Sequence, residues 1–576
     1  MSIALGIDLG TTNSVAAIMQ DGRPMVIPCC EGSRLIPSVV AFSARGRRIV
    51  GRMAKCQAVA NPEGTVFSIK RKMGTDLKLS LFGGEYTPQE ISAMILKKIK
   101  SDVEAYLDME VPGAVITVPA YFNDRQRHAT REAGQIAGFE VLRILNEPTA
   151  ACLAYRLDRR GTQTALVWDL GGGTFDVSIL ELSGDVFLVR AVNGDTHLGG
   201  DDYDQRVMDH MLERFRREHG IDLSKDKIAL QRLRDAAEKL KMNLSRSLTS
   251  RISLPSIFSG GGGSGHLTFA LTRKEFQELT SDLVQRMIPP TLQVLSDAGV
   301  APEQVDIGIL VGGATRMPAV SDALRDLLGR EPLASENPDE IVALGAAVQA
   351  GIITGETKER VLVDVVPLSL GIETLGGVFS KIIDRNTPIP TSESLIVTNA
   401  EDNQAEVGVH VLQGERAMAR DNITLGQFQL KGIHPAPRGS ARIEVAFEVD
   451  VDGILGVSAE DLYSGNGERL DVSSTRGLDP EEIERMVREA ETHAEEDARL
   501  RERVETQIYA DNVIRGVEMA LEKADITSET HLMEKAERAL MDLKRAITDG
   551  DIDEISRRTS ALEALARPLF LRACKK

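Results

Sequence analysis

One short element occurs twice in this chain, and it limits the folds that the chain can adopt. The run from Ile7 to Ser14 reads IDLGTTNS, and the run from Trp168 to Asp176 reads WDLGGGTFD. In both, an apolar run ends on an aspartate, and glycine and threonine follow. Glycine permits a tight turn, and backbone N–H groups with a threonine hydroxyl can bind oxyanions. Two such turns facing each other predict a site that holds a polyphosphate and its magnesium from both sides.

Two other glycine-rich sequences and one absence refine this prediction. A third glycine turn, VGGATR, begins at Val311 after a strand-like run, and three such turns in this order favour ATP binding. A formal G-x-G-x-x-G at Gly260, Gly262 and Gly265 lies within a run of glycine and serine and precedes a strand-like segment, so we interpret it as a hairpin loop. No Gly-Lys dipeptide occurs in the sequence, which excludes a Walker A loop.

Length and composition indicate a globular protein with several domains. A chain of 576 residues exceeds a single core of ~250–300 residues. The net charge of −18 argues against nucleic acid and anionic membranes as partners. No run approaches the ~18 apolar residues of a membrane helix, and Asp8 interrupts the N-terminal apolar run, so we expect neither a membrane span nor a secretory signal. Five cysteines without CxxC spacing indicate free thiols and a cytoplasmic location.

The first part of the chain, residues 1–356, has the pattern of an α/β domain. Strand-like runs such as 114–118 and 164–168 alternate with helix-like segments such as 124–135. This alternation predicts layers of helices and sheet, with ligands at the carboxyl ends of the strands.

Two further patterns follow. Between 367 and 477, apolar residues recur with period two and the hairpin signal Asp452-Gly453 occurs, which predicts an antiparallel β-sandwich. From 478 to 576 the chain contains long charged segments with helical spacing, and Asp479 is a suitable N-cap for the first of them. We therefore expect a C-terminal helical region.

The boundary at 357–366 contains a short apolar stretch between charged residues, KERVLVD. It can be an ordinary edge strand, or a linker that docks into a groove in one state and is exposed in another. The pattern alone leaves both interpretations open.

Several longer motifs identify a family resemblance. They read TVFSIKR from Thr65, VPAYFND from Val118, NEPTAA from Asn146, HLGGDD from His197, NPDE from Asn337 and PLSLGIET from Pro367. With the glycine turns, they make the chain resemble the seventy-kilodalton heat-shock protein family, the bacterial DnaK type of molecular chaperone. The resemblance runs in one register from Ile3 to about Val513.

This resemblance implies a fold, an activity and partners. The fold would be an α/β ATPase domain of the actin/hexokinase type, an interdomain linker, a β-sandwich that binds peptides, and an α-helical lid. The activity would be ATP-dependent binding and release of extended apolar segments of unfolded proteins, coupled to hydrolysis of ATP to ADP and phosphate. Mg²⁺ is the expected cofactor, and K⁺ is a further candidate. A J-domain co-chaperone and a nucleotide-exchange factor are the expected partners of a mainly monomeric protein.

The resemblance also implies the residues of the ATP site. Lys70 resembles the lysine that places a positive charge beside the γ-phosphate and the attacking water. Outside this context, Lys70 reads as a surface lysine. Four carboxylates resemble those that hold magnesium, mostly through water, and orient the attacking water, and Thr174 joins this catalytic set; the four are Asp8, Glu147, Asp169 and Asp176. Residues expected to contact the nucleotide are Gly10, Thr11, Thr12, Asn13, Gly171, Gly172, Gly173, Gly199, Gly200, Glu238, Lys241, Ser245, Gly312, Gly313, Arg316 and Asp339.

Two further sets follow from the resemblance. The residues expected to couple the domains, some by receiving the J-domain, are Pro119, Arg127, Arg143, Asn146, Thr149, Val361, Leu362, Val363 and Asp364. The residues expected to line a peptide channel are Ile372, Leu375, Val397, Ala400, Val407 and Val409, with Val407 at the central pocket. Alternating residues on strands are more often core than site when no context is given.

The sequence also departs from the family pattern, and other classes of protein share part of it. Leu375 and Ala400 stand where the best-studied bacterial members have Met and Ala, Ala314 replaces a common serine, and the segment between Lys72 and Tyr86 is short. A sugar kinase or a filament-forming actin relative would share the nucleotide fold but would leave the sandwich unexplained. A specialised paralogue or a purely regulatory ATPase would have the same motifs.

Overall fold

The computed structural model describes residues 3–43, 48–82, 84–155, 161–260, 263–334, 337–357, 361–471, 494–523 and 530–573. Asp479, Gly262 and residues 358–360 of the expected linker lie outside these ranges. None of the helices in these ranges has the length and apolar character needed to cross a membrane.

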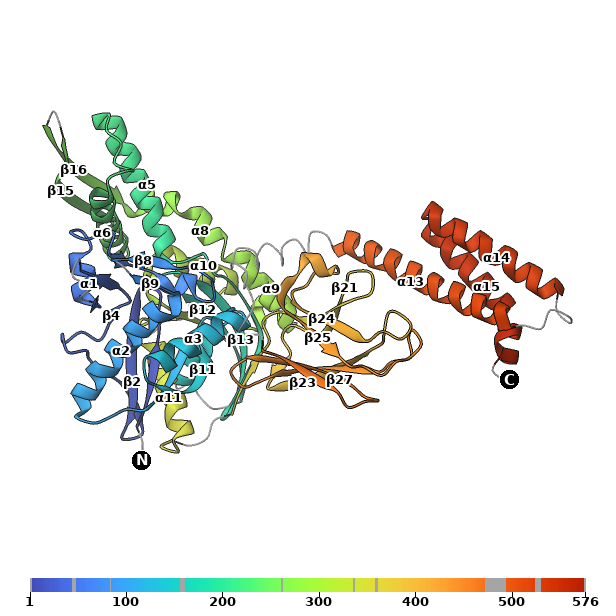
Figure 1. Ribbon diagram of the computed structural model, residues 1–576. Coiled ribbons are helices and arrows are strands. Elements are labelled where there is room, and N and C mark those ends of the chain that lie inside the picture. Colours follow the sequence, from blue (N-terminus) through green and yellow to red (C-terminus); the bar gives the residue numbers. More distant parts are fainter. Residues whose placement is uncertain are drawn as a thin grey trace.

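Two sheets form the framework of the N-terminal part (Figure 1). The strands of the first sheet are β1 (Ala4–Asp8), β2 (Asn13–Gln20), β3 (Arg23–Val26), β4 (Ile36–Pro37), β10 (Gly113–Val118) and β11 (Glu140–Asn146). The strands of the second sheet are β12 (Thr162–Leu170), β13 (Phe175–Ser183), β14 (Val186–Asp195), β17 (Ile307–Val311), β18 (Leu333–Ala334), β19 (Val361–Val365) and β22 (Pro388–Ile389).

The two sheets share one strand arrangement, which explains the repeated sequence element. The first has the order β11-β10-β1-β2-β3, and β1 runs antiparallel to β2 and parallel to β10. The second begins β18-β17-β12-β13-β14, and β12 runs antiparallel to β13 and parallel to β17. Each copy of the Asp-Leu-Gly element therefore forms the turn of an equivalent hairpin, β1–β2 or β12–β13. The strands expected at 114–118, 164–168 and 307–311 are confirmed.

Helices cover these sheets and fill the space between them. Both α4 (Glu147–Ala154) and α11 (Ile341–Ile353) contribute to a buried cluster that also contains residues of both sheets. The two helices approach closely at Gly345, where a Cβ atom would lie 1.6 Å from the carbonyl oxygen of Ala150. The remaining helices are α1 (Arg52–Gln57), α2 (Pro88–Leu107), α3 (Asp124–Ile136), α5 (Gly200–His219), α6 (Lys227–Leu244), α7 (Arg273–Leu279), α8 (Ser281–Gln285), α9 (Ile288–Ala298) and α10 (Pro318–Leu328).

The helix start at α3 follows from its sequence. The Asn123 side chain accepts a hydrogen bond from the Gln126 backbone N–H, and the Gln126 side chain accepts one from the Asn123 backbone N–H. This reciprocal pair is a capping box, which satisfies donors that the first helical turn leaves free. The expected helix at 124–135 is confirmed, and its N-terminus is fixed beside the loop that follows β10.

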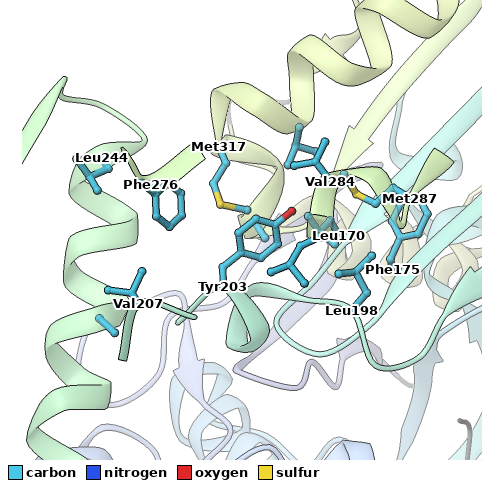
Figure 2. Close-up of a cluster of buried hydrophobic side chains, with 14 of the residues drawn as sticks. Leu170, Phe175, Leu198, Tyr203, Val207, Leu244, Phe276, Val284, Met287 and Met317 are labelled. Carbon is cyan, nitrogen blue, oxygen red and sulfur yellow. The ribbon is translucent and has the colours of Figure 1, made fainter. Parts of the chain in front are cut away.

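A buried cluster supports the second glycine turn. Figure 2 shows Tyr203 of α5 between Met317 and Leu170, and its ring lies 6.3 Å from that of Phe276. Leu170 and Leu198 of the same cluster flank the glycines that follow β12 and precede α5. Full burial of one large apolar side chain contributes ~1.5–3 kcal/mol to folding stability. This cluster therefore holds the residues on either side of the glycine turn in place.

Smaller two- and three-stranded sheets complete this part. The glycine-rich loop joins β15 (Thr249–Gly260) to β16 (Gly263–Thr272), which pair antiparallel, so the hairpin interpretation is confirmed. The other small strands are β5 (Val40–Phe42), β6 (Arg48–Val50), β7 (Thr65–Val66), β8 (Leu79–Leu81) and β9 (Gly84–Tyr86).

The expected sandwich is present as two four-stranded antiparallel sheets around one core. The first, which we call the β24 sheet, has the order β21-β20-β24-β25, and the second, the β26 sheet, has the order β23-β26-β27-β28. The strands are β20 (Leu370–Thr374), β21 (Val378–Ile383), β23 (Thr391–Val397), β24 (Glu406–Gln413), β25 (Ile423–Lys431), β26 (Ile443–Val449), β27 (Leu455–Asp461) and β28 (Gly467–Asp471).

The described residues after the sandwich form three helices: α13 (Ala494–Lys523), α14 (Thr530–Asp549) and α15 (Ile552–Ala573). They share a small core that includes Val517, Leu543 and Leu562. In Figure 1 this bundle lies beyond the sandwich, on the side away from the two large sheets.

Candidate functional site

The two repeated turns face each other at the centre of the N-terminal part. A Cβ atom on Gly172 would lie 1.8 Å from the Thr12 hydroxyl oxygen, and one on Gly173 would lie 2.8 Å from that of Thr11. A Cβ on Gly199 would come within 2.5 Å of the Gly172 carbonyl. Only glycine fits these close approaches, so the turns bring threonine hydroxyls and backbone amides of both sheets to one point.

Helix α5 adds a further group of amides beside the second turn. The Gly200 backbone N–H donates to the Gly171 carbonyl at 2.9 Å, and the Asp201 N–H donates to the Gly172 carbonyl at 2.8 Å. The positive end of the α5 dipole therefore points at the turn, which favours an anion there. Gly10 and Asn13 lie in the first turn, where a Cβ on Gly10 would meet the Asn13 carbonyl at 2.1 Å.

Four carboxylates surround one lysine next to the turns. Asp8 ends β1, Glu147 begins α4, and Asp169 and Asp176 lie opposite each other on β12 and β13. The Lys70 ammonium donates to Glu147, and both side chains are buried. The Thr174 side chain is also buried in the turn between β12 and β13. The structure thus brings together all six residues that the sequence assigned to catalysis.

Burial and mutual repulsion disfavour the charged forms of three carboxyl groups in this cluster. Burial raises the pKa of Asp8 to about 7, and repulsion from Glu147 adds to the rise. The pKa of Asp176 is raised to about 7 by the same two effects, and that of Asp169 is raised well above its ordinary value. One lysine cannot neutralise four carboxylates, so a bound cation would relieve the repulsion.

The residues present fit a hydrated magnesium ion. Asp169 Oδ2 and Asp176 Oδ2 are buried and have no hydrogen-bond partner among the described residues. Within the same residues, no group of three or more His, Cys, Asp or Glu side chains converges closely enough to ligate a metal directly. The two unpaired, buried carboxylate oxygens are hard donors of the kind that Mg²⁺ prefers, and Mg²⁺ usually keeps much of its water shell.

The residues expected around adenosine lie on α6 and on the third glycine turn. Lys241 pairs with Asp204 at 2.6 Å, and Ser245 donates to the Lys241 carbonyl at the end of the same helix. Across the site, Arg316 pairs with Asp339 at 3.0 Å. A Cβ on Gly313 would lie 2.3 Å from Asp339 Oδ1, so the turn at Gly312 and Gly313 lies against that carboxylate.

Three ion pairs or hydrogen bonds close the cleft between the two halves of this part. Lys55 of α1 pairs with Glu238 of α6 at 2.7 Å. Ser68 donates to Asp201 at 2.6 Å. Arg71 pairs with Asp202 at 2.5 Å, so the segment around Lys70 is tied to the start of α5.

A chain of hydrogen bonds leads from this cluster to β19. Asp176 Oδ1 accepts from the Tyr121 backbone N–H at 3.1 Å. The carbonyls on either side of Tyr121, those of Ala120 and Phe122, accept from Arg127 at 3.1 Å each. Arg127 also donates to Asn146 at 2.6 Å, and Asn146 donates to Asp364 at 2.6 Å.

Two charged residues of this chain, Arg127 and Asp364, are buried. Burial lowers the pKa of Arg127. Burial also raises the pKa of Asp364, and the positive charge of Arg127 partly offsets that rise. Breaking the chain would leave buried charges without partners, so the arrangement favours two discrete states rather than gradual loosening. Pro119 and Thr149, also expected to couple the domains, are buried as well. Burial lowers the pKa of Arg143, and the negative charge of Asp364 partly offsets that effect.

The described end of the linker forms strand β19, which pairs with two different strands along its length. Val361, Leu362 and Val363 pair in parallel with β14 of the second sheet. Asp364 and Val365 pair with β22, which leads into the sandwich. The apolar residues Val361–Val363 thus pair on one side, as in an edge strand, and the next two residues connect the second sheet to the strand that leads into the sandwich. Both interpretations of the linker fit this arrangement, and its release in another state stays a prediction.

Sequence reasoning missed the residues by which the sandwich itself contacts α3 and β11. Asp452, read only as part of a hairpin signal, pairs with Arg131 and accepts from the Ile144 backbone N–H at 3.0 Å. Its carbonyl accepts from Arg127 at 3.3 Å. Asp124 accepts from the Leu455 backbone N–H at 2.6 Å. The sequence offered one clue: Asp452 lies in a turn, but its side chain is not needed to form that turn and is therefore available for contacts elsewhere.

The peptide-channel residues occupy two environments. Ile372, Val407 and Val409 belong to the buried core of the sandwich, and Val397 packs against it. Leu375 is about half exposed, at 49%, and Ala400 is exposed in a loop. All six residues thus belong to the sandwich, four in or against its apolar core and two, Leu375 and Ala400, at its exposed rim. Peptide binding between them stays a prediction.

Comparison with protein families agrees with this geometry. A family model described as Hsp70 protein matches residues 4–82 and 77–575, which is nearly the whole chain. The match includes the sandwich and the C-terminal helices, which neither a sugar kinase nor a filament-forming actin relative would explain.

Proposed function

We propose that this chain, which belongs to the Hsp70 family, binds and releases extended apolar segments of unfolded proteins in step with its ATP cycle. Members of the family are ATP-dependent chaperones with an actin-like ATPase, a β-sandwich and a helical lid, and they use ATP with Mg²⁺. Chaperone and ATPase activity in general therefore follow from the family. The way in which the ATP site controls the sandwich is the part that we propose.

In the ATP site, the facing turns with Thr11, Thr12 and Thr174 would bind phosphate oxygens. Lys70 would place its fixed charge beside the γ-phosphate and the attacking water, a position that its pairing with Glu147 supports. Bound Mg²⁺ would neutralise developing charge on the phosphate oxygens. The carboxylates would orient its waters and accept a proton from the attacking one.

The hydrogen-bond chain from Asp176 to Asp364 is the observation that carries the coupling. Asp176 belongs to the catalytic carboxylates and also holds the Tyr121 amide. A shift of Asp176 on hydrolysis would move the carbonyls that hold Arg127, and Arg127 would then lose its hold on Asn146 and Asp364. β19 would leave β14, and the sandwich would separate from α3.

We call the arrangement with β19 paired to β14 and the sandwich in contact with α3 the docked state. In this state a bound peptide would exchange freely. The C-terminal helices pack on one another, and Leu375 at the sandwich rim is exposed. Burying one leucine-sized side chain gives ~1.5–3 kcal/mol, so a single pocket binds weakly unless the lid closes over it. Undocking after hydrolysis would permit that closure.

A J-domain co-chaperone would act at the same interface. Asn146 and Thr149 are buried in this arrangement, whereas Arg143 of β11 is partly exposed and close enough to Asp364 to affect its charge. A partner would therefore reach the end of the chain through Arg143. We propose that such a partner promotes release of β19 and thereby hydrolysis.

The test is the dissociation rate of a fluorescent extended apolar peptide, measured with ATP and with ADP. Reciprocity holds for binding free energies, so ATP and peptide should weaken each other's binding by the same factor. Through the proposed chain, ATP should also speed peptide release and peptide should speed hydrolysis. Asn146→Ala should remove both effects while nucleotide still binds. Equal peptide release with ATP and ADP in the unmodified chain would contradict the proposal.

A further inference from the structure

His410 is the centre of a hydrogen-bonded row on the outer face of the β24 sheet. Its Nδ1 lies 2.6 Å from Glu373 Oε2, and its Nε2 lies 2.8 Å from Thr424 Oγ1. The three residues come from the adjacent strands β20, β24 and β25. With the proton on Nδ1, the ring donates to Glu373 and accepts from Thr424, so both nitrogens are satisfied.

The row crosses the place where β20 and β24 separate. Their backbone pairing runs from Leu370 opposite Gln413 to Ile372 opposite Val411, and among the described residues it ends there. Beyond Ile372, β20 stays paired with β21 only, while β24 stays paired with β25. The Glu373–His410 contact therefore takes the place of the next rung between two diverging strands.

On the other side, the same ring spans an irregularity between β24 and β25. Leu412 lies opposite Thr424 and Val411 opposite Gly426, so Leu425 is an extra residue, a β-bulge. Thr424 thereby comes within reach of His410. One side chain thus holds a split on one side and a bulge on the other.

The opposite face of these strands is the wall of the expected peptide channel. Side chains alternate between the two faces of a strand, so Ile372 and Val409 point inward next to Glu373 and His410, which point outward. Ile372 and Val409 are buried in the sandwich core. A change in the separation of β20 from β24 would move these two side chains relative to each other.

We propose that Glu373, His410 and Thr424 form a clasp that positions the channel wall and slows peptide release. This inference rests on the proposed peptide-binding function of the sandwich. With the clasp intact, β20 and β24 keep Ile372 and Val409 at their binding distance. Without it, the strands part more easily at their unpaired ends and the bound segment leaves sooner.

The test compares variants that differ only in the clasp. Thr424→Val removes the hydroxyl with little change in shape, Thr424→Ser keeps it, and His410→Phe removes both contacts but keeps a flat ring. Loss of a hydrogen bond of this kind changes an equilibrium constant or a rate by about fivefold. Peptide release with ADP should therefore be about fivefold faster in Thr424→Val and at least that in His410→Phe, and near normal in Thr424→Ser.

A matched control lies on the other sheet of the sandwich. Ser394 of β23 donates to Glu444 of β26 at 2.7 Å on an exposed face, a cross-strand side-chain bond away from the split. Ser394→Ala should leave peptide release unchanged. Equal acceleration in Ser394→Ala, or unchanged release in both Thr424→Val and His410→Phe, would overturn the clasp.

Hydrogen exchange separates this inference from the proposed function. Amides of Leu370–Ile372 and Val411–Gln413, which report the β20–β24 pairing, should exchange about fivefold faster in Thr424→Val whether or not any peptide binds. Unchanged exchange there would overturn the clasp. If these amides respond but the unmodified chain binds no apolar peptide, the peptide-binding proposal is what fails.

Discussion

Asp452 offers the sharpest perturbation of the contact between the ATPase part and the sandwich. Its side chain accepts from the Ile144 backbone N–H and pairs with Arg131, and the residue is only 5% exposed. Asp452→Ala would leave the Ile144 amide unsatisfied in the docked state, which costs about 2–3 kcal/mol when the lost partner is charged. That cost shifts the docking equilibrium by about 30- to 150-fold toward the separated state.

The assay is hydrogen exchange of the β19 amides with ATP bound, because docking protects Val361, Leu362 and Val363 through their pairing with β14. Protection should fall by roughly the same 30- to 150-fold in Asp452→Ala. The matched control is Glu448→Ala, since Glu448 lies 3.9 Å from Arg469 and its side chain is 65% exposed. Unchanged protection in Asp452→Ala, or an equal loss in Glu448→Ala, would refute the assignment of Asp452 as an interface residue.

Three further outcomes are expected. Lys70→Ala should bind ATP but lose most of its turnover, which single-turnover hydrolysis measures; a normal rate would exclude Lys70 from catalysis. Val407→Phe should fill the central pocket and weaken the binding of an extended apolar peptide at least tenfold, while unstimulated ATPase activity persists. Fluorescence anisotropy measures this affinity, and an unchanged value would disprove the pocket. The raised pKa of about 7 for Asp8 and Asp176 means that the metal-free fold holds extra protons between about pH 4 and 7, so these groups lower its stability as pH rises through that window. Binding of Mg²⁺ with ADP should release protons and strengthen from about pH 6 to 8, and calorimetry in two buffers that shows no proton release would contradict this.

Much of the architecture could be predicted because local signals agreed with the final fold. The repeated Asp-Leu-Gly element marked both hairpin turns, and period-two residues marked the sandwich strands. The residues that the family resemblance assigned to catalysis lie in contiguous motifs such as the one that contains Glu147, and the structure brings them together, while their catalytic roles stay predictions. Close approach of the turns at Thr12 and Gly172 required glycine, and glycine is visible in a sequence.

The interface between the parts was harder to predict. Asp452 and Asp124 act across more than three hundred residues of sequence, and neither position has a local pattern that distinguishes it from a turn or cap residue. The linker was ambiguous for a similar reason, since a short run of valine, leucine and aspartate reads alike in an edge strand and in a docked one. The row through His410 depends on a strand split and a bulge, which backbone pairing shows and residue periodicity does not.

The central claim is that the hydrogen-bond chain from Asp176 to Asp364 links hydrolysis to the sandwich. The most direct measurement is single-turnover ATP hydrolysis with and without an extended apolar peptide, in the unmodified chain and in Asp364→Asn. This substitution keeps the size of the side chain but removes the buried charge that faces Arg127. We predict that peptide accelerates hydrolysis in the unmodified chain and has little effect in Asp364→Asn. Equal acceleration by peptide in both proteins would contradict the account.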